Sequence, residues 1–205
     1  MAFSDFSYAD VFPEFGLNET PPADLFAAVP AVASGPLARH AATDGARLAL
    51  AIDSEKARSE WIVAPLLFDV WRRYGGRISL YSGLEFEADP PAKLTGFCDF
   101  MLGLAPQSLR VRSPLTVIFE AKKDSISGGL GQCVAAMVGI QRFNRREGHP
   151  TDTAFGCVTT GSLWRFVRLA GADLTLDEVE YSLADVDKLI GILCHLYGPI
   201  PPAAA

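Results

Sequence analysis

Apolar residues along this chain follow two spacings, one typical of helices and one typical of strands. Helical spacing starts at Pro36 and covers residues 36–53 in part, then residues 54–74, 127–145 and 183–197. Strand-like runs cover residues 77–87, 94–104, 115–122, 154–160 and 163–169, with prolines or glycines between them. From residue 54 onward, the pattern predicts a helix, three strands, a helix, two strands and a final helix.

The first 35 residues show neither spacing clearly. Prolines and Gly35 occur there among aromatic residues and alanines, which indicates a loosely structured arm with one short helix near residues 24–29. We therefore divide the chain into residues 1–53, an N-terminal arm and helix packed on the core, and residues 54–205, an α/β domain that ends in a Pro/Ala-rich tail from Pro199. With 205 residues, the chain fits a single compact domain overall.

Charge and composition exclude several classes of protein. The net charge of −6 provides no general basic field for nucleic acid, although a carboxylate site that binds cations remains compatible with it. The four cysteines form no C-x-x-C pair, and the three histidines are scattered, which disfavours zinc sites. The start of the chain lacks a signal-peptide pattern and no apolar run reaches about 18 residues, so we expect a cytoplasmic protein without a membrane partner.

Three charged residues interrupt segments that otherwise have the pattern of buried strands. Asp99 lies within residues 94–104, and Glu120 and Lys122 close the apolar run that starts at Leu115. Alternate side chains of a strand share a face, so Glu120 and Lys122 project together. Unpaired charges are costly in such surroundings, and two carboxylates on adjacent strands offer the oxygen ligands that Mg²⁺ or Mn²⁺ prefers. A lysine beside them can orient an attacking water or stabilise charge on a phosphate.

A further acid lies on the helix predicted over residues 54–74. At about 100° per residue, Glu60 falls on the apolar side of that helix, whereas Glu55 falls on the opposite side together with Arg58. Pro65 is expected to kink this helix. We therefore take Glu60 as the acid that faces the strands.

Asp99 followed by Glu120-x-Lys122, on the second and third of three strands between two helices, resembles the PD-(D/E)XK, or restriction-endonuclease-like, nuclease superfamily. The resemblance implies an αβββαβ core, with a central mixed sheet flanked by helices, an extra N-terminal helical arm and a C-terminal helix. It implies these site residues: Asp99 and Glu120 as metal ligands, the Ala121 carbonyl as a further ligand, Lys122 as the catalytic lysine, and Glu60 as the helix acid near the metal.

One branch of that superfamily, which includes nuclease domains of type I restriction subunits, carries a glutamine at the start of the second helix, and Gln132 resembles it. Two positions depart from the family pattern. Cys98 stands where the signature has a proline, and Ala136 stands where that branch has a tyrosine.

The resemblance implies a Mg- or Mn-dependent hydrolase of phosphodiester bonds, an endonuclease or exonuclease. DNA is the expected substrate, RNA is the alternative, and a homodimer is left open. Two other interpretations of the same residues stand beside it. Glu120 and Lys122 can form a simple ion pair at a strand end, and the whole chain can be a catalytically silent module of this fold that binds a protein partner.

Overall fold

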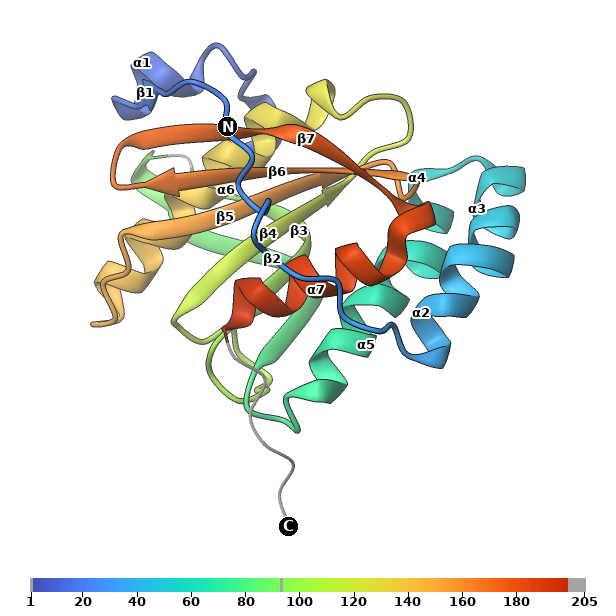
Figure 1. Cartoon of the computed structure of the whole chain (residues 1–205). Coiled ribbons are helices and arrows are strands. Elements are labelled where there is room, and N and C mark those ends of the chain that lie inside the picture. The colour runs from blue at the N-terminus through green and yellow to red at the C-terminus, as the bar shows by residue number, and fades with distance from the viewer. Residues whose placement is uncertain (1, 93, 199–205) are drawn as a thin grey trace.

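A central sheet organises the residues that the computed structural model describes, which are 2–92 and 94–198. It has seven strands in the order β1-β7-β6-β5-β4-β3-β2 (Figure 1). The strands are β1 (Asn18–Glu19), β2 (Ser79–Asp89), β3 (Leu94–Gly103), β4 (Leu115–Ala121), β5 (Thr153–Thr159), β6 (Leu163–Ala170) and β7 (Asp173–Ser182). The pairs β4–β5 and β1–β7 are parallel and the others are antiparallel.

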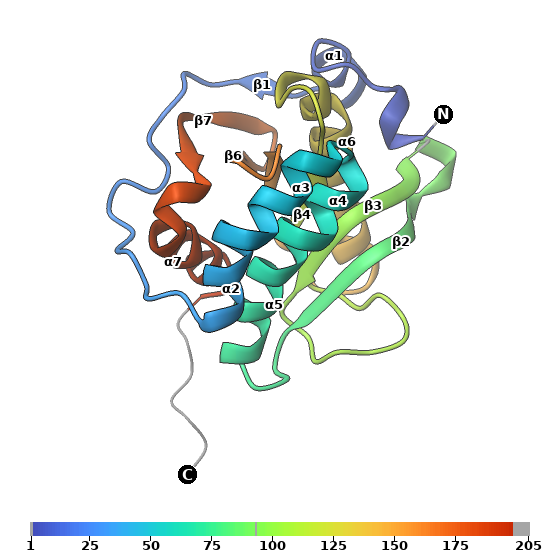
Figure 2. The ribbon, with the colours of Figure 1, turned by 90° about the vertical axis from the view of Figure 1, so that its right-hand side faces the viewer.

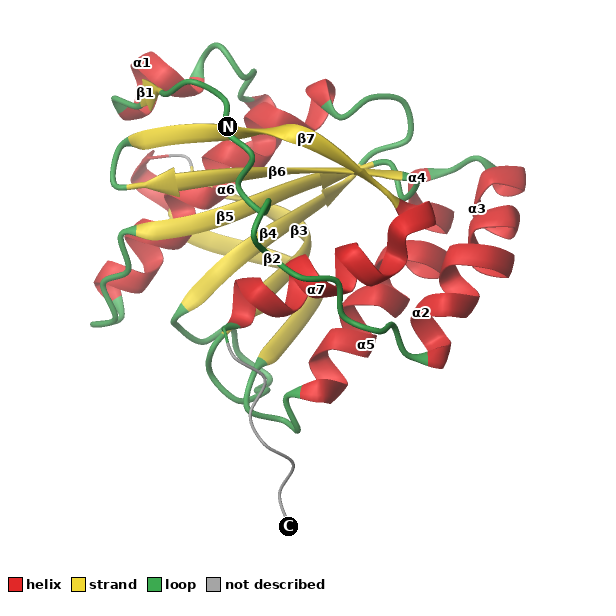
Figure 3. Ribbon diagram, in the orientation of Figure 1, coloured by secondary structure: helices red, strands yellow, loops and turns green. Residues whose placement is uncertain are grey.

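Helices cover both faces of this sheet, as Figure 3 shows. The α-helices are α1 (Val11–Phe15), α2 (Pro36–His40), α3 (Ala46–Ile52), α4 (Glu55–Arg58), α5 (Ala64–Arg73), α6 (Ser127–Arg146) and α7 (Val186–Tyr197). Side chains of α5 and α7 pack with Phe119 on one face, and side chains of α6 pack with Ile118 on the other. Helix α6 thus connects the parallel strands β4 and β5 as the crossover that such a pair requires.

The predicted α/β organisation with a mixed sheet and flanking helices is confirmed. Each strand-like run corresponds to a strand, from β2 to β6, and the helices predicted at 127–145 and 183–197 are α6 and α7. Strand β7 lies in a segment that the pattern left unassigned. The short helix predicted near residues 24–29 is wrong, because that segment forms turns that place Phe26 in the core. The tail from Pro199 lies outside the described residues.

The helix predicted over residues 54–74 is not uniform. A π-helical turn, η3 (Ser59–Val63), separates α4 from α5, and a second one, η2 (Ala41–Gly45), separates α2 from α3. Pro65 has no N–H to donate to the Trp61 carbonyl, which accounts for the wider turn there. Gly45 packs against that carbonyl so closely that a Cβ would collide with it. Figure 2 shows these helices facing the viewer.

This wider turn shifts the faces of the helix. A π-turn holds more residues than an α-helical turn, so a uniform rotation of about 100° per residue no longer applies across it. Arg58, expected on the polar side, is buried, with 8% of its surface exposed, and Asp69 of α5 is also buried, with 5% exposed. Glu60, expected on the apolar side, is exposed. The prediction that Glu60 points into the apolar interior is therefore wrong.

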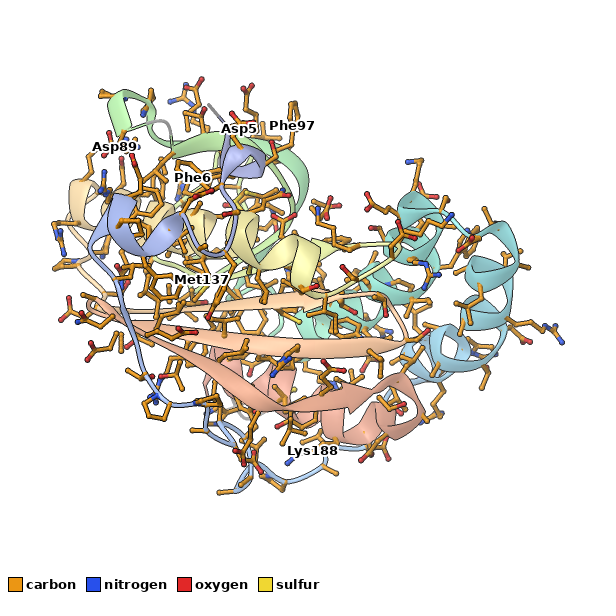
Figure 4. All side chains as sticks on the ribbon, turned by 90° about the horizontal axis from the view of Figure 1, so that it is seen from above. Asp5, Phe6, Asp89, Phe97, Met137 and Lys188 are labelled. Atoms are coloured by element: carbon orange, nitrogen blue, oxygen red, sulfur yellow. The ribbon has the colours of Figure 1, made fainter. Side chains whose placement is uncertain are left out.

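The N-terminal arm is anchored at several points rather than loose. Phe3 and Val11 are buried in the core on the α6 side, and the backbone around Ser7 touches Gly131 of α6, where a side chain would collide. Farther along, Lys188 holds the arm by donating to the Phe26 and Val29 carbonyls at 2.8 and 2.6 Å (Figure 4). No helix in residues 2–92 and 94–198 is both long and apolar enough to cross a lipid bilayer.

The state of the four cysteines fits their wide separation along the sequence, which offered no C-x-x-C pair. All four are free thiols and all four are buried: Cys98, Cys133, Cys157 and Cys194.

Candidate functional site

Strands β3 and β4 separate at the position where the charged residues begin. Their regular pairing ends at Phe100 and Phe119. Beyond this pair, the Ala121 N–H donates to Asp99 Oδ2 at 2.7 Å, so a side chain replaces the backbone acceptor of the neighbouring strand. This bond fixes the Asp99 carboxylate next to the end of β4. The structure therefore brings Asp99 and Glu120 together, as the sequence pattern requires for a shared site.

Glu120 is the most unusual residue of the site. Its side chain is only 1% exposed, and within the part of the chain that the structure describes its Oε1 has no hydrogen-bond partner. Burial, and after it the negative charge of Asp99, raises the pKa of the Glu120 carboxyl to about 8, against the opposing effects of Lys122 and a hydrogen bond with Gln132. A buried carboxylate oxygen without a donor normally costs free energy, which makes this atom a candidate ligand.

Burial also raises the pKa of Asp99, although the bond from Ala121 and the positive charge of Lys122 lower it in part. The charge of Glu55 acts in the same direction as burial. The two carboxyls thus compete for one lysine. A bound cation would relieve this competition, because it favours the ionised form of both.

Lys122 leaves the end of β4 and turns toward α6. Its Nζ donates to Gln132 Oε1 at 3.0 Å and lies 3.9 Å from Glu120 Oε2. The side chain is 22% exposed, so it can reach a bound substrate. Its stem packs over Gly129, where an added Cβ would come within 3.1 Å of it. Gln132 therefore positions the lysine, and Gly129 makes room for it, a role that the sequence analysis did not assign.

Glu55, rather than Glu60, is the helix acid whose charge acts on both carboxyls. Ser54 caps α4 by accepting from the Ala57 N–H at 3.1 Å, which places Glu55 at the first helical position. Glu55 Oε1 also accepts from the Lys123 N–H, immediately after the motif, at 3.3 Å. Ser54 followed by an acid is a helix-start signal that is visible in the sequence and could have identified Glu55.

Glu60 lies farther out. Its side chain is 52% exposed and forms an ion pair with Lys56 at 2.7 Å. Glu60 and Asp99 nevertheless line the same cleft, which has a volume of about 380 Å³ and also includes Glu55 and Lys56. The predicted helix acid Glu60 therefore lines the cleft with Asp99, while Glu55 is the acid whose charge acts on both carboxyls.

A small ionic network holds the N-terminal end of α4 beside the C-terminal ends of β4 and β5. Asp53 is paired with Lys123 at 3.0 Å and with Arg58 at 3.1 Å. Arg58 also donates to the Thr160 carbonyl, just beyond β5, at 2.7 Å. These contacts join the segment before α4 to the ends of β4 and β5. They explain why the first residue of α4 lies next to the two carboxylates.

The donor set has the chemistry of a site for a hard divalent cation. Asp99 and Glu120 supply carboxylate oxygens, and the free Glu120 Oε1 is an acceptor without a donor. Within residues 2–92 and 94–198, no three His, Cys, Asp or Glu side chains are arranged as a complete metal site. Mg²⁺ usually keeps several waters and takes one or two carboxylates, so this smaller set still fits it.

Comparisons of the chain with protein-family models, with curated proteins and with solved structures found no match. The function must therefore be argued from the site itself.

Proposed function

We propose that this protein is a metal-dependent nuclease of the PD-(D/E)XK type that hydrolyses phosphodiester bonds. The observation that carries the proposal is the buried Glu120 carboxyl, which has an unpartnered oxygen and lies beside Asp99 with Lys122 at 3.9 Å. A buried carboxylate oxygen without a donor costs free energy unless a ligand or a proton satisfies it, which favours a ligand site over a purely structural ion pair. The order of elements around it, with the acids on β3 and β4 and a crossover helix after them, also supports the proposal.

Asp99 and Glu120 would hold Mg²⁺ or Mn²⁺, with the Ala121 carbonyl as a further ligand. The bound ion would act as a Lewis acid and lower the pKa of a bound water. The Ala121 N–H keeps Asp99 in place by its bond at 2.7 Å. Preorganised ligands of this kind avoid the cost of rearranging when the substrate binds.

Lys122 is the residue that we assign to the attacking water and the phosphate. Gln132 Oε1 accepts one of its ammonium hydrogens at 3.0 Å, so the remaining hydrogens are directed elsewhere. With these, Lys122 can orient a water and stabilise the negative charge that develops on the phosphate. Glu55 and Glu60 on the wall of the cleft can bind waters around the cation. DNA is the proposed substrate, with RNA as the alternative.

The test is cleavage of supercoiled plasmid and of labelled single-stranded DNA and RNA with millimolar Mg²⁺ or Mn²⁺. We expect cleavage by the wild type and a loss of about 100-fold or more in Glu120→Gln and Lys122→Met, because both substitutions keep the shape of the side chain and remove its charge. Glu87→Gln is the matched control, since Glu87 is an exposed acid on β2 outside the site. It should cleave like the wild type.

Equal trace cleavage by the wild type and by Glu120→Gln would refute the enzymatic proposal, because the signal would then come from a contaminant. In that case a calorimetric titration with Mn²⁺ distinguishes what remains. Absence of Mn²⁺ binding at millimolar concentration would favour a catalytically silent module that acts through a protein partner.

A further inference from the structure

An apolar groove lies next to the cleft that contains Asp99. It has a volume of about 320 Å³, and its apolar lining consists of Leu37, Ala41, Gly45, Leu48, Trp61 and Pro65. This volume is at the low end of the roughly 300–1,000 Å³ typical of small-molecule pockets. Glu60 lines both the groove and the cleft. A ligand that extends from Asp99 past Glu60 therefore enters the groove.

Trp61 is the aromatic side chain of this groove. It lies in the π-turn η3 directly after Glu60, and it is 46% exposed. The other two tryptophans are engaged in the fold, since Trp164 is fully buried and the Trp71 indole N–H donates to the Ile78 carbonyl at 3.2 Å. An exposed indole beside a site for phosphate chemistry is the type of platform on which nucleobases stack.

The charged side chains of the cleft and the groove indicate where the phosphate and where the base of a nucleotide would bind. Lys56 lines the cleft and is 82% exposed. Its partner is Glu60, at 2.7 Å, and a substrate phosphate can replace that carboxylate. His40, Asp44 and Glu60 also line the groove. Asp44 is paired with Arg47 at 3.2 Å and Glu60 with Lys56 at 2.7 Å, and the remaining lining is apolar and suits a neutral base better than a phosphate. The arrangement favours a phosphate at Lys56 and a base at Trp61.

We propose that the groove binds an unpaired nucleobase next to the scissile phosphate, so that the substrate is single-stranded nucleic acid. The position of the scissile phosphate rests on the proposed function. A base within a duplex is paired and stacked, and it must leave the helix before it can enter such a groove. Duplex binding also depends on many phosphate contacts to basic residues, and a chain with a net charge of −6 offers little general attraction for a duplex.

The test is binding of a labelled single strand of about 12 nucleotides and of the same sequence as a blunt duplex, measured by fluorescence anisotropy on the full chain. Ca²⁺ replaces Mg²⁺ in this assay. We expect Trp61→Ala to weaken single-strand binding by about 5- to 100-fold, and Trp61→Phe to retain most of it. Phe68→Ala is the matched control, because Phe68 is an aromatic side chain of α5 that is 41% exposed and does not line the groove. It should bind like the wild type.

Three results would overturn the inference: no binding of the single strand by the wild type, unchanged binding by Trp61→Ala, or equal losses on single strand and duplex. If the groove instead binds a protein partner, Trp61→Ala should bind the single strand as the wild type does. Cleavage that requires Glu120 but does not depend on Trp61 would overturn the inference and leave the proposed nuclease intact. Trp61-dependent binding without any cleavage would support the groove as a site for an unpaired base and refute the nuclease.

Discussion

Replacing Glu120 by glutamine should stabilise the protein in the absence of metal. The pKa of Glu120 is raised from an ordinary value of 4.5 to about 8. An acid whose pKa is higher in the folded state binds its proton more tightly there, so stability is lost as the pH rises from about 4.5 to about 8. At about 1.4 kcal/mol per pKa unit, this difference corresponds to a loss of about 5 kcal/mol of unfolding free energy.

The side chain is almost completely buried, so solvent screening reduces this value little. Glutamine has nearly the same shape and carries no charge at any of these pH values. The Glu120→Gln variant should therefore match the wild type near pH 4.5, and above pH 8 it should be more stable by several kcal/mol. Its stability should also vary less with pH.

The assay is denaturation by urea in EDTA at pH 5 and pH 9, with stability taken from the linear dependence on denaturant. Glu60→Gln is the control, because Glu60 is a largely exposed acid near the same cleft. Its effect should stay within about 0.5 kcal/mol at both pH values. A Glu120→Gln variant that is less stable than the wild type at pH 9 would refute the reasoning, since it would show that the ionised carboxylate is well satisfied.

Two further predictions concern packing beside Lys122 and a buried polar contact at the start of β4. Gly129→Ala should destabilise the protein by about 1–3 kcal/mol, because the new Cβ would lie 2.7 Å from Val158 Cγ1; thermal unfolding should show no comparable loss in Gly128→Ala, whose Cβ meets only a side-chain oxygen at 3.2 Å. Asn144→Ala should cost about 2 kcal/mol or more, because the buried Asn144 amide accepts from and donates to the Leu115 backbone at 2.8 and 2.7 Å; unchanged denaturation midpoints would contradict this account.

The elements that follow a simple period were predictable from the sequence, and strand β7 shows why others were not. Leu174 and Leu176 alternate as in a strand, but Val179 and Tyr181 continue the alternation one position out of phase. The pairing between β6 and β7 shifts its register at this point, where Val167 pairs with Leu176. The irregularity interrupts the apparent period, so the strand was not visible as a single pattern.

The candidate site was predictable to a similar extent. Asp99, Glu120 and Lys122 were found because a charge within an apolar strand is conspicuous, whatever the exact register. The exposure of Glu60 was not foreseen, because the π-turn η3 shifts the phase of the helix between Glu55 and the residues that follow it. The role of Gly129 was not predicted. Gly129 matters because it lacks a side chain where Lys122 packs, and the sequence alone does not show which residue packs there.

The charges around the site connect the pH-dependent stability of the protein with the metal binding that we propose. Of the nearby cations, Lys123 is paired with Asp53 and Lys56 with Glu60, both on the periphery. Arg58 is also paired with Asp53. Among the described residues, Lys122 is the cation whose charge acts on both Asp99 and Glu120, and the excess negative charge can be compensated in two ways. Without metal, Glu120 retains its proton to a higher pH than usual. If the proposed divalent cation binds, that proton would leave, so metal binding and proton release at Glu120 would form a single equilibrium that favours the metal as the pH rises.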